Sequence, residues 1–125
     1  TDSACEWYGI TCDESLENII EIDLEENNLI GSLPTELGLF TMMTSGLGFQ
    51  QNSLTGTLPT EMGLMTSISG GIYLQSNSFS GHIPSQFGMF TQLSTGLQLD
   101  GNHFSSSLPS QLGQLTHMEH VFWMG

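Results

Sequence analysis

The chain has 125 residues, with no lysine or arginine and 13 acidic residues, so its formal charge is −13 when the four histidines are neutral. Nucleic acids and anionic membranes are bound largely through lysine and arginine, so the composition argues against both as partners. Apolar residues make up 38 % and charged residues 10 % of the chain, which is typical of one folded domain. No apolar run is long enough to cross a bilayer, so we expect no direct membrane insertion by this segment.

The acidic residues are concentrated at the N-terminus, where nine of the 13 fall within the first 26 residues. Such a run is typical of a solvated, self-repelling face. A calcium site is the alternative, but the acidic residues lack the loop spacing that such a site needs. The chain begins at Thr1 without the basic region and apolar run of a signal peptide, so we expect a processed chain or a fragment.

Two cysteines, Cys5 and Cys12, lie in the string CEWYGITC. Their spacing does not match a CxxC redox pair, and no second pair is available for a zinc site. A local disulfide that staples this end of the fold is the natural interpretation, and it implies an oxidising compartment. Two free thiols in a cytosolic chain are the alternative.

The rest of the chain repeats itself with a spacing of 25 residues. One motif recurs in four copies: LPTELG at 33–38, LPTEMG at 58–63, IPSQFG at 83–88 and LPSQLG at 108–113. A series of asparagines keeps the same step: Asn27, Asn52, Asn77 and Asn102. Each asparagine follows an alternating apolar pair, such as Ile22 and Leu24, and precedes another apolar residue. This pattern, L-x-L-x-x-N-x-L, is that of a leucine-rich repeat.

Each apolar pair predicts a short strand, with the apolar residues inward and the residues between them outward. The asparagine closes the turn that follows, where its amide can satisfy unpaired backbone groups. We expect the coils to stack with parallel strands, so that the four asparagines form a ladder through the solenoid.

At the matching positions the chain resembles the plant-type leucine-rich repeat, whose pattern reads LxxLxxLxLxxNxLxGxIPxxLGxLxx. Its start resembles the N-terminal cap of that family through C-x-W-x-G-I-x-C, carried by Cys5, Trp7, Gly9, Ile10 and Cys12. The resemblance implies an α/β-type solenoid, a right-handed leucine-rich-repeat superhelix. Short parallel strands would form its concave face, and loops, turns and short 3-10 segments its convex face. The chain would divide into a disulfide cap over 1–18 and about five coils over 19–125, the last incomplete.

Two departures from the family pattern lead to further expectations. The family period is commonly one residue shorter, and the extra residue here precedes strands that follow Gly46, Gly71 and Gly96, so we expect a bulge or a widened turn there. The fifth coil also stops at Trp123, Met124 and Gly125 without a C-terminal cap. A solenoid needs polar caps at both ends, so this open end implies further repeats or self-association.

The outward residues of successive strands form three columns on the concave face. The first column is Glu21, Gly46, Gly71, Gly96 and His120; the second is Asp23, Gly48, Tyr73, Gln98 and Phe122; the third is Glu25, Gln50, Gln75, Asp100 and Met124. A tyrosine among amides and a carboxylate suits a polar ligand. The ligand-binding candidates are therefore Tyr73, Gln75, Gln98, Asp100, Gln50 and Phe122. An ordinary hydrated sheet surface without a ligand is the alternative, because five coils offer little area.

Catalysis finds little support in the sequence. The chain has no GxSxG motif, and without lysine or arginine it has neither a P-loop lysine nor an arginine clamp for phosphate. The spacing of His117 and His120 places them on opposite faces of a strand, which argues against a metal pair. We therefore expect no enzyme activity, no cofactor and no metal.

The resemblance implies a non-catalytic extracellular or cell-surface recognition module, such as a receptor ectodomain, that binds a protein, peptide or glycan. A secreted inhibitor of cell-wall hydrolases, or another secreted binding protein with these repeats, is the alternative. Binding to ice or polysaccharide surfaces ranks below both, because the row Thr55, Thr57 and Thr60 is followed by Ser80, His82 and Ser85. No asparagine is followed two residues later by serine or threonine, so we expect no N-glycosylation.

Overall fold

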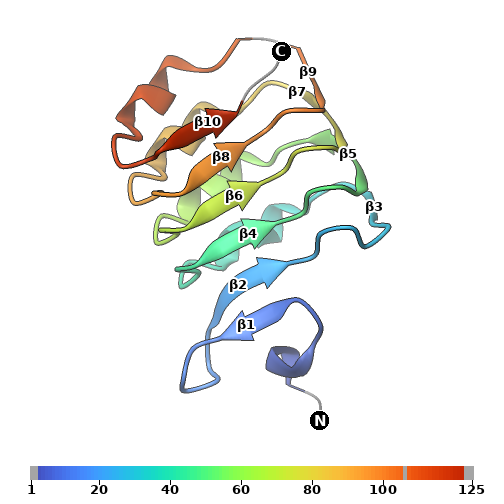
Figure 1. Ribbon diagram of the computed structural model, residues 1–125, viewed down its shortest axis with the longest axis vertical. Coiled ribbons are helices and arrows are strands. Elements are labelled where there is room, and N and C mark those ends of the chain that lie inside the picture. Colours follow the sequence, from blue (N-terminus) through green and yellow to red (C-terminus); the bar gives the residue numbers. More distant parts are fainter. Residues whose placement is uncertain (1–2, 106, 123–125) are drawn as a thin grey trace.

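The structure is a computed structural model that describes residues 3–105 and 107–122, with side chains up to residue 119. The chain winds into stacked coils, in which strands of two parallel sheets alternate with short 3-10 helices (Figure 1). This arrangement confirms the predicted solenoid. The predictions for Ser106, Trp123, Met124 and Gly125 lie outside the described residues, as does the side chain of Phe122.

The larger sheet has six strands in the order β1-β2-β4-β6-β8-β10, and its outward surface is the concave face. Its strands are β1 (Ile10–Cys12), β2 (Ile19–Asp23), β4 (Gly46–Gly48), β6 (Gly71–Tyr73), β8 (Gly96–Gln98) and β10 (His120–Phe122). All neighbouring strands from β2 onward pair in parallel. The alternation of apolar and other residues accounts for this sheet, because the apolar residue of each strand, such as Leu47 or Ile72, is buried inward.

The predicted bulge near three glycines is wrong. Gly46, Gly71 and Gly96 are the first residues of their strands, and the pairs Glu21 with Gly46 and Gly71 with Gly96 are in regular register. The extra residue lies instead in the segment between each helix and the next strand. Neighbouring segments bond to each other there, as from Gly70 N–H to the Ser45 carbonyl oxygen at 2.7 Å. Within this sheet the register shift lies in the cap, between Thr11 and Cys12.

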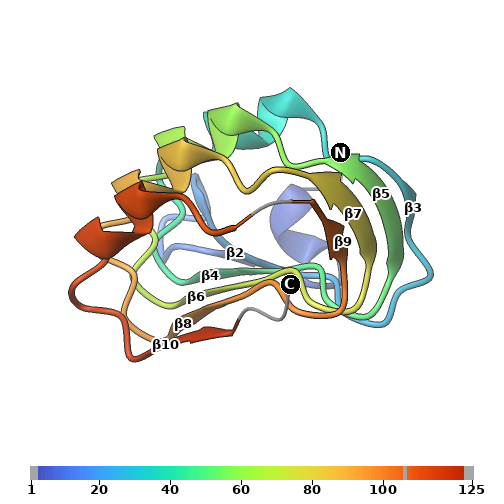
Figure 2. The ribbon, with the colours of Figure 1, turned by 90° about the horizontal axis from the view of Figure 1, so that it is seen from above.

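The second sheet was not expected, since the sequence predicts only loops, turns and 3-10 segments outside the concave face. It has the order β3-β5-β7-β9, with strands β3 (Ile30–Gly31), β5 (Ser53–Thr57), β7 (Ser78–Gly81) and β9 (His103–Phe104). Phe79 and Phe104 stack beneath it with ring centroids 6.5 Å apart. A view along the solenoid shows three sides: the two sheets and the row of helices (Figure 2).

The third side consists of helices η2 (Thr35–Leu39), η3 (Thr60–Leu64), η4 (Ser85–Met89) and η5 (Ser110–Gln114). Each begins after the proline of its motif, whose extended backbone ends the preceding segment. The side chains that point inward from these helices, such as Leu37, Met62 and Phe87, are buried in one continuous core. None of the helices in the described part of the chain is long and apolar enough to cross a membrane.

The glycine of each helix allows the next coil to lie close. A Cβ on Gly38 would lie 2.3 Å from the Glu61 carbonyl oxygen, and a Cβ on Gly88 would lie 2.5 Å from that of Gln111. By contrast, a Cβ on Gly113 would have nothing within 4 Å. We therefore expect Gly38→Ala to lower the free energy of unfolding by about 1–3 kcal/mol, because the two coils must move apart. Gly113→Ala, the same change at the same repeat position, is the control and should leave urea unfolding almost unchanged.

The asparagines join one coil to the next. The Asn77 amide accepts a hydrogen bond from Leu54 N–H at 3.0 Å and donates to the carbonyl oxygen of Phe49 at 2.9 Å. Asn52 and Asn102 make equivalent bonds to the coil before each of them. Asn27 is exposed, and only its backbone N–H takes part, as a donor to Asn52 Oδ1, in the bonds described. The asparagines thus satisfy backbone groups that the turns leave unpaired.

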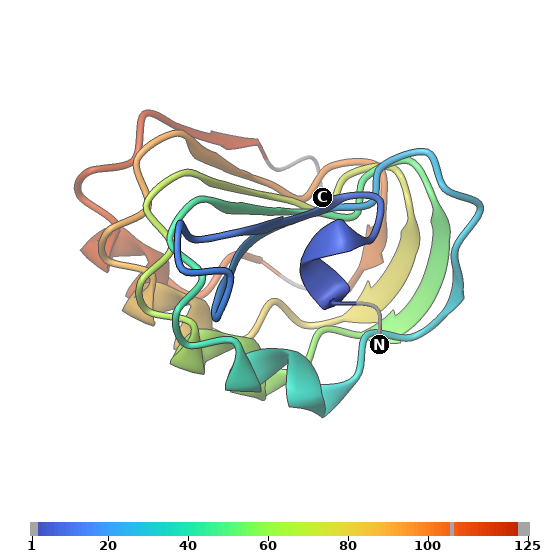
Figure 3. The same ribbon diagram turned by 90° about the horizontal axis from the view of Figure 1, so that it is seen from below.

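The N-terminal segment covers the first coil. Helix η1 (Ala4–Glu6) lies below the coils, and β1 adds antiparallel to β2 at the edge of the larger sheet (Figure 3). A disulfide joins Cys5 to Cys12. Gly9 touches the first coil, because its carbonyl oxygen accepts from Asp23 N–H at 2.7 Å and its φ of 80° favours glycine. Trp7 remains 61 % exposed.

Asp13 holds together the loop between β1 and β2. Its carboxylate accepts hydrogen bonds from the Asn18 side chain at 2.7 Å, from Ser15 Oγ at 2.8 Å, and from the backbone N–H groups of Glu17 and Asn18. These bonds, that of the Asn18 side chain foremost, lower the pKa of Asp13 to about 2. Since the pKa is lower in the folded state, the stabilisation is present above the ordinary pKa of 3.8 and is lost as the pH falls toward 2.

We expect an NMR titration of the Asp13 carboxyl to give a midpoint near the lowered pKa, about 2. In Asn18→Ala the midpoint should rise toward the ordinary value, because the strongest donor is gone. Asp100, whose carboxyl lies on another coil, is the internal reference and should titrate alike in both proteins. An unchanged Asp13 midpoint in Asn18→Ala would contradict the assignment of the shift to Asn18.

Candidate functional site

The candidate site is the concave face, because the register of the larger sheet aligns the outward residues of neighbouring coils. Asp23 pairs with Gly48, Gly48 with Tyr73, and Tyr73 with Gln98. Phe122 of β10 pairs with Gln98 through the backbone. The second column expected from the sequence is therefore continuous across five strands, which places side chains of distant repeats next to each other.

Tyr73 and Gln98 form the centre of the predicted patch. They lie on the adjacent strands β6 and β8, and both are half-buried. The Tyr73 ring folds back along its strand and covers Gly71, where a Cβ would collide with the ring. Gly46 and Gly96 flank Gly71 in the same column. A flat aromatic ring on a floor of glycines gives a shallow surface that can contact the backbone of an extended ligand.

The third column follows the strands and continues the alignment. Its members Gln50, Gln75 and Asp100 are half-buried, and backbone bonds join Gln51 N–H to Gln75 O and Ser76 N–H to Asp100 O. The Gln50 Nε2 donates to Glu25 Oε2 at 2.7 Å. The amide oxygens Oε1 of Gln50 and Gln75 are buried and have no hydrogen-bond partner in the described part of the chain. Buried acceptors of this kind are costly unless a partner reaches them.

The N-terminal end of the face is more structured than a merely solvated acidic run. Glu21 and Asp23 line a pocket of about 280 Å³ together with Tyr8, Gly9 and Thr11 of the cap, and Ile10 completes it. The cap residues reach this position because β1 pairs with β2. The sequence shows that Glu21 and Asp23 point outward, but the pocket depends on how the cap packs beside them.

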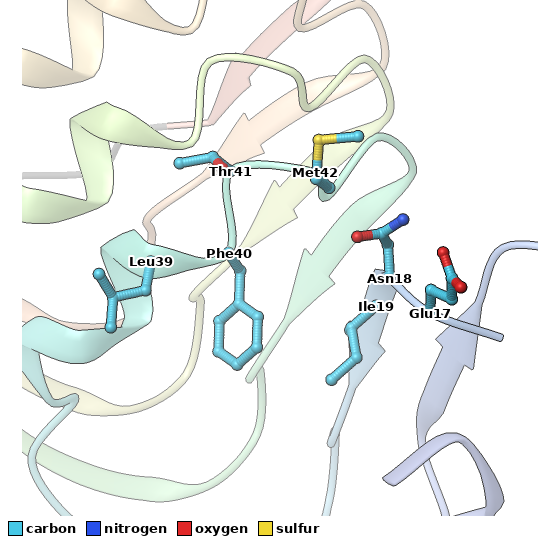
Figure 4. A pocket seen from close by; sticks show the side chains of 7 residues that line it. All are labelled: Glu17, Asn18, Ile19, Leu39, Phe40, Thr41 and Met42. Carbon is cyan, nitrogen blue, oxygen red and sulfur yellow. The ribbon is translucent and has the colours of Figure 1, made fainter. Parts of the chain in front are cut away.

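A second pocket, of about 200 Å³, lies on a different side of the solenoid (Figure 4). Its lining combines apolar and polar residues from the end of the cap and the turn after η2: Glu17, Asn18, Ile19, Leu39, Phe40, Thr41 and Met42. Leu39 continues into a row of exposed apolar residues, one on each of η2, η3 and η4, with Leu64 and Met89 as the others. This surface has no feature that specifies one ligand.

The histidines near the C-terminus do not gather. His117 lies in the turn before β10, and its Nδ1 is 3.2 Å from the Thr91 carbonyl oxygen. His103 is exposed and begins strand β9, rather than lying in a turn as the sequence suggests. Among the residues with described side chains, no three histidine, cysteine or acidic groups lie together as metal ligands.

A family model for the leucine-rich repeat matches residues 18–40. That segment includes β2, β3 and η2, which together form the first coil. No curated protein matches the chain in sequence.

Several solved structures are similar to the chain. That of PEPR1 with AtPEP1 has a TM-score of 0.87 and 26 % identity, over 97 % of this chain and 16 % of that one. The ectodomain of the Arabidopsis receptor kinase HAESA, solved with an extended IDA peptide hormone, has a TM-score of 0.64 and 25 % identity, over 93 % of this chain and 23 % of that one. A plant ice-binding protein has a TM-score of 0.70 and 22 % identity, over 96 % of this chain and 48 % of that one, which shows the fold alone.

The chain thus spans less than a quarter of the first two proteins, and the match includes almost all of its own length. The repeated strands, the asparagine ladder and the disulfide near the N-terminus agree with these comparisons. The chain is a leucine-rich-repeat protein of the plant type, with a cysteine cap at its N-terminus.

Proposed function

We propose that the chain is a non-catalytic recognition module that binds an extended peptide, or an extended segment of a protein, across its concave face. It would act at the cell surface or in a secreted protein, in keeping with its disulfide. The observation that carries the proposal is the alignment of half-buried Tyr73 and Gln98 on adjacent strands of an otherwise shallow face.

Two further features support this proposal. Aromatic and amide side chains on a rigid sheet provide contact area and hydrogen bonds with little loss of conformational entropy. The HAESA ectodomain, which is similar in fold and 25 % identical, was solved with a peptide hormone. A glycan would use the same polar groups, and it is an outcome that the binding experiment below would separate.

The test is to select binders from a random peptide library displayed on phage, and to measure their affinities for the chain and its variants. We expect Tyr73→Ala and Gln98→Ala to weaken the selected peptides by at least about tenfold, as is usual for residues at the centre of an interface. Gln92→Ala is the matched control, because Gln92 is an exposed glutamine in a turn outside the concave face. Peptides that bind all four proteins equally would refute the concave face as the site, and a face that selects glycans from an array but no peptide would refute the ligand class.

Binding to an ordered surface such as ice is a second candidate, favoured by the second sheet. Its exposed residues include a set of hydroxyls: Ser53, Thr55, Thr57, Ser80 and Ser105. Strands β3, β5, β7 and β9 contain no acidic residue. The hydroxyl of Thr55 is held by the Gly31 carbonyl oxygen at 3.3 Å. A plant ice-binding protein has a similar fold.

Thermal hysteresis measured on the chain tests this second candidate. If the sheet binds ice, Thr57→Glu should abolish the hysteresis, because a charge on this surface keeps its own hydration. Thr66→Glu, at an exposed threonine in the turn after η3, is the control and should retain it. The absence of hysteresis in the unmodified chain would eliminate the candidate.

A further inference from the structure

Gly48 leaves a notch in the concave face where two oxygen acceptors meet. If Gly48 carried a Cβ, that atom would lie 2.9 Å from Gln50 Oε1 and 3.0 Å from Asp23 Oδ1. The two oxygens, from adjacent coils, therefore converge on the space that the missing side chain leaves open. Hydrogen-bond donors are what such a pair of acceptors can receive.

The amide oxygen in this notch has no partner of its own. Gln50 is held in place by its other end, since Nε2 donates to Glu25 Oε2 at 2.7 Å. Its Oε1 is buried without a hydrogen-bond partner among the described residues. The neighbouring Asp23 Oδ1 receives only a long bond from Glu25 N–H, at 3.4 Å, among the bonds described. Both oxygens are free to accept further donors.

The charge around the notch is uniformly negative. Glu21, Asp23, Glu25 and Glu26 lie at this end of the concave face, and the last three are exposed. The chain contains no lysine or arginine that could neutralise them. A cationic partner would therefore meet attraction at long range and unpaired carboxylates at contact.

Aromatic surfaces lie on both sides of this acidic end. Tyr8 of the cap lines the pocket with Glu21 and Asp23, and 80 % of its surface is exposed. Tyr73 is the register partner of Gly48 on the opposite side. A guanidinium or ammonium group beside carboxylates can also be stabilised by the face of an aromatic ring.

We propose that the N-terminal half of the concave face binds a basic peptide segment, and that one arginine or lysine side chain enters the notch at Gly48 to donate to Asp23 and Gln50. This inference rests on the proposed function and names the class of peptide. The site extends from the cap pocket through β2 and β4 to Tyr73, a length that suits an extended segment with several cationic residues.

Fluorescein-labelled octa-arginine is the probe, and its affinity is measured by fluorescence anisotropy at low and at physiological salt. We expect Asp23→Asn to weaken binding by about tenfold, the loss expected for a hydrogen bond between charged groups. Glu36→Gln removes one charge from an exposed position on η2, outside this face, and should change the affinity by less than about twofold. A labelled Gly-Ser octapeptide should not bind.

Gly48→Ala separates the notch from general attraction to an acidic surface, because it leaves the net charge unchanged. The added methyl group meets only the ends of two side chains, so the fold should persist. We expect about a tenfold loss of affinity for octa-arginine, since the methyl group occupies the space of the donor. If Gly48→Ala does not fold, Gln50→Leu removes the same acceptor and should cause a similar loss.

The proposal is overturned if the notch variants and Asp23→Asn bind octa-arginine as tightly as the unmodified chain, or no more weakly than Glu36→Gln does. This failure is distinct from that of the proposed function. Displayed peptides that depend on Tyr73 and Gln98, combined with octa-arginine binding that ignores Gly48, would retain the peptide-binding module and reject its preference for basic segments.

Discussion

Phe87→Ala is expected to lower the free energy of unfolding by about 3–5 kcal/mol, the range for removing a large aromatic side chain from a packed core. The Phe87 side chain is fully buried under η4, and its ring lies 5.0 Å from that of Phe90. In a solenoid each coil packs only against its neighbours, so a cavity in a central coil separates the two halves of the core. Urea unfolding followed by circular dichroism measures the change.

Met89→Ala is the matched control for this prediction. Met89 is two residues away on the same short helix, and 51 % of its surface is exposed. Its removal should change the free energy of unfolding by less than about 0.5 kcal/mol, since an exposed apolar side chain contributes little. Equal losses in the two variants would mean that Phe87 is not part of a packed core.

Asn77→Ala should destabilise the chain by about 2–4 kcal/mol, because it leaves buried backbone groups without a partner. Leu54 N–H would lose its acceptor, and the carbonyl oxygens of Phe49 and Leu74 would each lose a donor. Asn77 is a buried polar side chain, 7 % exposed, at the middle of the ladder. No hydrophobic substitute can satisfy these groups.

Asn27→Ala tests the same residue type at the first position of the ladder. Asn27 is exposed, and among the bonds described its side chain makes none, so we expect a change below about 0.5 kcal/mol. Thermal unfolding of both variants gives the comparison. A large effect at Asn27, or none at Asn77, would contradict the role of the ladder as a link between coils.

The repeat explains why much of this fold can be predicted from the sequence. Each strand of the larger sheet has an apolar residue between two outward residues, and the same phase recurs every 25 residues. Parallel stacking then requires Tyr73 to lie beside Gln98, as it does. The expectation of a bulge at Gly46 was wrong because the extra residue is accommodated in the turn, where neighbouring coils bond to each other.

The candidate site was only partly predictable. The alternation of side chains gives which residues point outward, and this places Asp23, Tyr73 and Gln98 on the concave face. It does not give the direction of a long side chain along that face. Gln50 bends toward Gly48 because its amide nitrogen is bound by Glu25, and the cap contributes Tyr8 because β1 folds back beside β2.

The sequence by itself determined the solenoid, the parallel larger sheet and the composition of its columns, because a strict repeat imposes the same local conformation on every coil. Only the tertiary structure decided the second sheet, the position of the cap and the notch at Gly48. These features depend on hydrogen bonds and side-chain directions between residues of different coils, such as Asn77 with Leu54 and Gln50 with Glu25. Such contacts form only when the coils stack, and a local pattern carries no record of them.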